Sequence, residues 1–63
     1  MNQKPVVQLS GQDGNVFNLI SIVRLALKEQ VSREKAEEFT ARAVQCESYD
    51  EVLSLIQEYV DVI

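Results

Sequence analysis

The amino-acid sequence predicts a small α+β domain, a two-stranded sheet packed on three helices in the order β-α-α-α-β. Three observations support this prediction. Valine-rich segments lie near both ends of the chain, a glycine loop and two capping serines divide the part between them, and apolar residues there recur at helical spacing. The chain has 63 residues, too few for a second hydrophobic core, so residues 1–63 are expected to form a single domain.

Residues 5–9 are predicted to form the first strand, because they are short, β-branched and bounded by turn-forming residues. Pro5 suits the first strand position, where its missing N–H does least harm. Residues 10–15 hold both glycines of the chain and are predicted to form a loop. Either Asp13 or Asn15 can cap the helix that follows.

Residues 16–29 are predicted to form the first helix. Their main apolar face fills about 160° of the helical circumference. Phe17 and Leu25 fall outside that face, among polar side chains. Lys28, near the end of the segment, complements the helix dipole.

Ser32 is the predicted N-cap of a second helix over residues 33–45. Its apolar stripe is narrow, and Glu38 and Arg42 have the favourable i, i+4 order for an ion pair. The residues assigned to that stripe are Ala36, Phe39, Ala43 and Cys46, with Val44 at its edge.

Ser48 and Glu51 match a capping box, which predicts a third helix from residue 49 to about residue 57. Its inner stripe is assigned to Tyr49, Val52, Leu53 and Ile56. Residues 58–63 alternate valine with Asp61 and are predicted to form the second strand, because the first strand needs a partner. Two strands alone are barely stable, so the helices are expected to cover one face. Whether the strands pair parallel or antiparallel stays open.

Composition argues against several functional classes. The chain has no histidine and one cysteine, so neither an internal disulfide nor a zinc site is expected. Convergent groups for acid–base or nucleophilic catalysis are missing, which predicts a protein that is not an enzyme and needs no cofactor. The lone thiol and the lack of an apolar leader or a membrane-spanning segment predict a cytoplasmic protein without membrane contact.

The charge distribution is uneven. The net charge is −4, and residues 46–63 carry five acidic side chains without a basic one. This acidic balance argues against nucleic acid as the main partner. The alternative is a nucleic-acid-binding regulator that uses a local basic patch within residues 24–35. The members of that patch are Arg24, Lys28, Arg33 and Lys35.

The loop has a suggestive position, since a strand, a glycine loop and a helix start are the parts of many phosphate sites. The candidate residues are Asp13, Gly14 and Asn15. They match neither nucleotide-binding glycine motif nor the calcium-loop pattern, and the Asp13 carboxylate would repel a phosphate. A turn with a helix cap is the favoured interpretation.

The remaining apolar residues indicate a partner surface. Phe17 and Leu25 lie off the main face of their helix, and Leu55 lies at the edge of the third. If all three are exposed, they form a patch suited to a protein partner; the alternative is that they complete the core. The leading hypothesis is a non-enzymatic accessory or regulatory module that binds another protein or itself, most specifically as a homodimer through residues 16–29.

Several short motifs resemble an uncharacterised family of small bacterial proteins associated with phages or other mobile elements. The first is a strand followed by Gly-x-Asp-Gly-Asn and an aromatic residue, here Gly11, Asp13, Gly14, Asn15 and Phe17. The second is an aromatic-Asp pair before the last helix, with an acidic-aliphatic tail, here Tyr49, Asp50, Leu53 and Asp61-Val62. The resemblance implies a phage or mobile-element context and supplies no activity.

Overall fold

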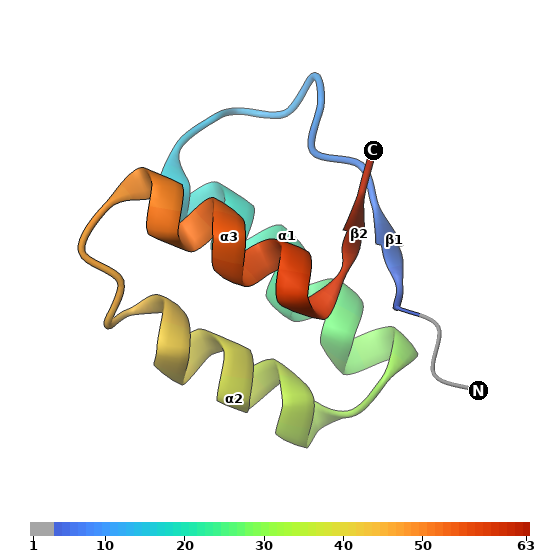
Figure 1. Cartoon of the computed structure of the whole chain (residues 1–63). Coiled ribbons are helices and arrows are strands. Elements are labelled where there is room, and N and C mark those ends of the chain that lie inside the picture. Colours follow the sequence, from blue (N-terminus) through green and yellow to red (C-terminus); the bar gives the residue numbers. More distant parts are fainter. Residues whose placement is uncertain (1–3) are drawn as a thin grey trace.

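The computed structural model describes residues 4–63 and has the predicted β-α-α-α-β order (Figure 1). Its elements are β1 (Val6–Val7), α1 (Val16–Gln30), α2 (Arg33–Ala43), α3 (Tyr49–Tyr59) and β2 (Asp61–Val62). Figure 1 shows α1 and α3 running in one direction and α2 in the opposite one, with the strands at the end where α3 finishes. The predicted α+β class is therefore confirmed.

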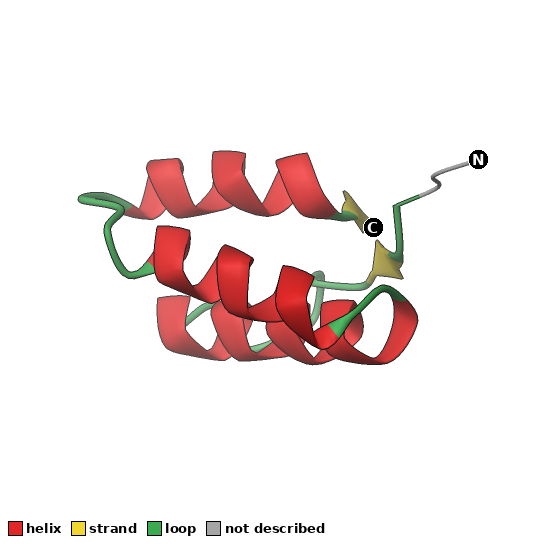
Figure 2. Ribbon diagram, turned by 90° about the horizontal axis from the view of Figure 1, so that it is seen from below, coloured by secondary structure: helices red, strands yellow, loops and turns green. Residues whose placement is uncertain are grey.

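The two strands pair in parallel, which settles the question that the sequence left open. Val6 lies opposite Asp61, and Val7 lies opposite Val62. The amide of Asp61 donates to the carbonyl of Pro5 at 2.9 Å, so the first residue of the predicted strand takes part through its acceptor alone. Figure 2 shows the strand pair at one end of the three helices.

Each helix begins at a polar cap. The Asn15 side chain accepts a hydrogen bond from the amide of Phe17 at 2.8 Å, and the Ser32 hydroxyl accepts one from Lys35 at 3.0 Å. Ser48 likewise accepts from the amide of Glu51 at 3.2 Å. These bonds satisfy donors that have no partner inside the helix, which explains why the three helices start where the capping signals predict.

The helix ends differ slightly from the prediction. α2 ends at Ala43, two residues early, because the amides of Gln45 and Cys46 bond three residues back instead of four, at 3.1 Å each. Such bonds tighten the last turn and release the chain toward α3. At the other boundary, α3 continues to Tyr59, and the amide of Val60 still bonds to Ile56 at 2.9 Å.

One hydrophobic core joins the three helices and β1. Val23, Phe39 and Ile56, one from each helix, have no exposed surface. Val7 and Val60 bring the sheet end of the fold into the same core. The other buried apolar residues are Leu19, Ile20, Leu27, Ala36, Ala43, Val52 and Leu55.

Candidate functional site

An exposed ridge runs along α1. Its residues are Phe17, Ser21 and Leu25, and we call them the α1 ridge. Their i, i+4, i+8 spacing places them in one row on the helix surface. Phe17 is 72% exposed and Leu25 is 53% exposed, and Ser21 between them is also exposed. Both apolar residues therefore lie on the surface, as the partner-surface hypothesis requires.

The third residue predicted for that surface was assigned wrongly. Leu55 is only 5% exposed and belongs to the core. The inner face of α3 is rotated toward Leu55 and Tyr59, because the helix packs on α2 as well as on α1. Tyr49, which was assigned to the inner stripe, is correspondingly 45% exposed.

A groove opens beside Phe17, at the end of the helices far from the sheet. Its exposed rim is formed by Phe17, by Val44 just after α2, and by Tyr49 at the start of α3. Buried side chains of Ile20, Ala43 and Val52 line its apolar floor. We call this feature the terminal groove.

Sequence reasoning found only one of the three rim residues. Val44 is 68% exposed because α2 has already ended at Ala43, and Tyr49 is displaced by the rotation of α3. The one indication in the sequence is that the predicted end of the second helix lies close to Ser48, the predicted cap of the third. This brings Val44 and Tyr49 near each other along the chain.

The glycine loop forms a turn and a helix cap. The Asp13 carboxylate accepts from the amide of Asn15 at 3.1 Å, while the Asp13 carbonyl accepts from the Asn18 side chain at 2.9 Å. Asp13 and Asn15 therefore cooperate, with Asn15 as the cap. Of the two glycines, only Gly11 adopts a positive φ, of 80°, which a side chain would strain.

A distant residue also holds the loop. The Tyr49 hydroxyl donates to the carbonyl of Gly14 at 2.9 Å, across 35 positions of sequence. This bond links the start of α3 to the residue before the α1 cap. The polar atoms of Asp13, Gly14 and Asn15 described above are thus used to build the loop and to join it to α3.

The four residues of the proposed basic patch are in different situations. Arg33 pairs with Glu37 at 3.1 Å, and Lys35 pairs with Glu38 at 3.4 Å. Within residues 4–63, Arg24 and Lys28 form no ion pair, and both are exposed on α1. Two of the four charges are therefore compensated locally, which weakens the patch as a phosphate-binding surface.

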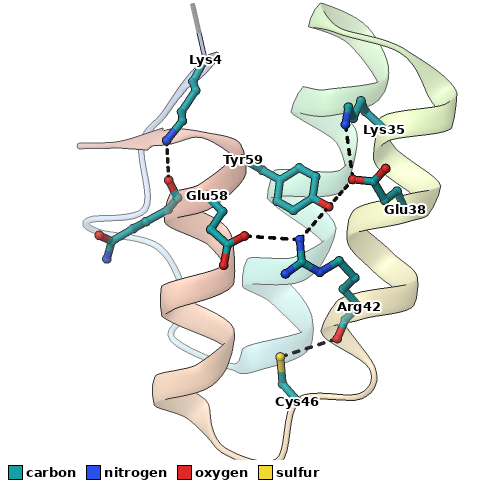
Figure 3. A network of polar contacts seen from close by, with 8 residues as sticks. Lys4, Lys35, Glu38, Arg42, Cys46, Glu58 and Tyr59 are labelled. Atoms are coloured by element: carbon teal, nitrogen blue, oxygen red, sulfur yellow. Dashed lines mark hydrogen bonds and ion pairs between the residues drawn. The ribbon is translucent and has the colours of Figure 1, made fainter.

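Tyr59 is the centre of a polar cluster between α2 and α3 (Figure 3). Its hydroxyl donates to the Glu38 carboxylate and accepts from Arg42 at 3.2 Å. Arg42 pairs with Glu58 at 3.3 Å instead of forming the predicted pair with Glu38. Both bases also approach the Tyr59 ring, with the Lys35 nitrogen 6.0 Å and the Arg42 guanidinium carbon 5.7 Å from its centre.

The cluster shifts the protonation of its members. Hydrogen bonds from the Tyr59 hydroxyl and then from Lys35 lower the pKa of Glu38 below its usual value. Partial burial, together with the bond to Glu38, raises the pKa of Tyr59. These contacts stabilise the ionised carboxyl and the neutral phenol, which is the arrangement of a structural link between two helices.

The lone thiol lies just beyond α2. Cys46 is half-buried, and its Sγ donates to the Arg42 carbonyl at 3.6 Å. It was predicted to lie on the inner stripe of the second helix, but the early end of α2 places it in the connection to α3. In the part of the chain from residue 4 onward, no three histidine, cysteine or acidic side chains gather as metal ligands.

Comparisons with known proteins add no relative. No protein-family model matches the chain, and neither a curated protein nor a solved structure matches it significantly. Among the helices of residues 4–63, none has the length and apolar character needed to cross a membrane. Because no relative suggests a function, the function is argued from the α1 ridge and the terminal groove.

Proposed function

We propose that this protein is a non-enzymatic interaction module that binds another protein, or a second copy of itself, through the α1 ridge and the terminal groove. The observation that carries the proposal is the exposure of Phe17, whose side chain belongs both to the α1 ridge and to the rim of the terminal groove. Both features share this residue, so the α1 ridge and the terminal groove adjoin at Phe17.

The size of the domain strengthens the argument. A chain this short buries only about 60% of the surface that its unfolded form exposes, so large apolar residues are valuable inside the fold. Here the core is complete without Phe17, Leu25 and Val44, since none of them is buried. Aromatic and aliphatic side chains that gather on a surface mark interaction sites in soluble proteins.

The charges around this surface favour a defined orientation of the partner. Glu47 lines the terminal groove beside Phe17, and Asp50 lies in the first turn of α3. Arg24 and Lys28 lie toward the other end of the ridge. A partner that places basic groups near the groove would be attracted and oriented.

The biological setting is part of the same proposal. The motif around Gly11 and Phe17 resembles that of the phage-associated family, which implies a phage or mobile-element context for the proposed role. The lone thiol of Cys46 fits a reducing compartment such as the cytoplasm.

The proposal is tested by capture with matched variants. The wild-type chain, Phe17→Asp and Val62→Asp are immobilised separately and exposed to a bacterial extract supplemented with the free chain. Val62 is an exposed valine in β2, distant from the groove, so its variant controls for the added charge. Proteins that bind are identified by mass spectrometry, and circular dichroism checks that each variant is folded.

We expect at least one protein, which can be the chain itself, to bind the wild type and Val62→Asp and to be lost from Phe17→Asp. If the three samples retain the same proteins, the apolar surface is not a binding site and the proposal is wrong.

A further inference from the structure

We propose that the α1 ridge is the centre of a two-fold symmetric dimer, in which α1 of one copy packs antiparallel against α1 of a second copy with Ser21 at the axis. This inference rests on the proposed function and names the partner as a second copy of this chain. It is carried by two observations, the spacing of the ridge and the distribution of charge along it.

The spacing of the ridge is symmetric. Phe17 lies four residues before Ser21, and Leu25 lies four residues after it. In an antiparallel pair with its axis at Ser21, Phe17 of each copy therefore faces Leu25 of the other. The two largest exposed apolar side chains of α1 would cover one another twice, as an interface with two-fold symmetry requires.

The small side chain at the axis permits close contact. Helices pack with their axes about 8–10 Å apart, and rows of residues spaced by four fit into the grooves of the facing helix. A serine at the crossing point leaves room for the Phe17 and Leu25 side chains on either side. A larger residue at this position would separate the two helices.

Charge distinguishes antiparallel from parallel packing. The Phe17 end of the ridge has acidic neighbours, Asp13 in the loop and Glu47 in the terminal groove. The Leu25 end has two bases, Arg24 and Lys28, which form no ion pair within residues 4–63, and one acid, Glu29, so its net charge is positive. Antiparallel packing brings the acidic end of each copy to the basic end of the other, whereas parallel packing brings like charges together.

The same complementarity favours a second copy over an unrelated protein, because the ridge matches itself when its direction is reversed. The contact is modest, since stable interfaces bury about 1,200 Å² or more in total and two turns of helix contribute only part of that area. The terminal groove extends the contact beside Phe17. We therefore expect a reversible dimer whose population depends on concentration.

The first measurement is the molar mass of the full chain over a range of concentrations, by sedimentation equilibrium. We expect the wild type to approach twice the monomer mass as concentration rises. Leu25→Glu places a charge opposite the Phe17 ring of the second copy and should weaken the dimer at least about tenfold. Val62→Glu adds the same charge on exposed β2 and should dimerise as the wild type does.

The second measurement locates the axis. Ser21→Cys in a Cys46→Ser background places one thiol of each copy at the axis, within reach of a disulfide. Mild oxidation should yield a covalent dimer. Ser54→Cys in the same background is the control, because residue 54 is exposed on α3 and should remain monomeric under the same conditions.

The outcomes separate this inference from the proposed function. A wild type that is monomeric at every concentration, or a folded Leu25→Glu that dimerises as well as the wild type, overturns the α1 dimer. In either case the capture experiment still tests whether the surface binds a different protein. Loss of the dimer in Val62→Glu alone would overturn the inference as well, because it would place the interface at the edge of the sheet.

Discussion

The hydroxyl of Tyr59, in the last turn of α3, donates a hydrogen bond to the carboxylate of Glu38, in the middle of α2. The same ring packs edge-on against Phe39, with 5.3 Å between the ring centres. Phe39 is fully buried, so the aromatic pair continues the core outward to the polar cluster at the surface. One residue of α3 is thus held by both an apolar and a polar contact with α2.

Replacing Tyr59 with phenylalanine should separate these two contributions. Tyr59→Phe retains the ring contact with Phe39 but removes the bonds to Glu38 and Arg42. We expect the free energy of unfolding to fall by about 1 kcal/mol, since the site is only partly buried. Urea denaturation followed by circular dichroism measures the change.

The matched control for that variant is Glu37→Gln. It removes a pair between Arg33 and Glu37 whose side chains are both largely exposed. Such pairs contribute little to stability, so the urea midpoint should not move. Equal effects of the two variants would show that the Tyr59 hydroxyl is no more important than a surface charge.

The Glu38 contacts should make stability depend on acid pH. The folded-state pKa of Glu38 is lowered from the usual 4.5, first by the bond from Tyr59 and then by Lys35. A lowered pKa stabilises the folded state above pH 4.5, and that contribution is lost as the pH falls through the folded-state pKa. Wild type should therefore be more stable than Glu38→Gln at neutral pH, with the gap closing in acid. Urea midpoints of both proteins across this range provide the test, and a gap that is constant with pH would contradict it.

The bond from Tyr49 to Gly14 should control the stability of the loop before α1. Tyr49→Phe removes the only hydroxyl in that contact, while its ring stays at the rim of the terminal groove. We expect the amides of Asn15 and Phe17 to exchange with solvent about three- to tenfold faster, because opening of the loop then breaks one fewer hydrogen bond. Hydrogen exchange followed by NMR measures these rates.

The amide of Phe39 is the internal control for the loop experiment, because Phe39 lies in α2 and the bond between Tyr49 and Gly14 does not involve α2. Its exchange rate should be the same in the wild type and in Tyr49→Phe. Uniformly faster exchange along the whole chain would instead mean that the hydroxyl supports global stability.

The local part of the fold was predictable because its causes lie within a few residues. A serine accepts from an amide three residues later at the start of α2 and again at α3, and Asn15 does so two residues later at α1. These short-range bonds fix helix starts regardless of what packs around them. The reciprocal bond of the capping box differs from the expected one. In a capping box the Glu51 carboxylate would accept from the amide of Ser48, the N-cap residue. Here it accepts from the amide of Glu47, one residue earlier, at 3.2 Å.

The candidate surface was only partly predictable. Phe17 and Leu25 could be identified because helical periodicity separates them from the main apolar face of α1. The burial of Leu55 could not be identified in this way. The inner face of α3 packs against both α1 and α2, and the periodicity of a single helix does not show where the neighbouring helices lie. The contribution of Val44 and Tyr49 to the groove depends on how α2 ends and how α3 turns.

By itself the sequence determined the element order, the helix starts and the outward position of Phe17 and Leu25, since capping and periodicity act over one or two turns. Only the tertiary structure decided the parallel direction of the strands, the burial of Leu55 and the meeting of Tyr59 with Glu38. Each of these depends on where α3 lies against α1 and α2. Packing of the whole core fixes that position, because the end of α3 delivers Asp61 to the carbonyl of Pro5 and thereby sets the strand register.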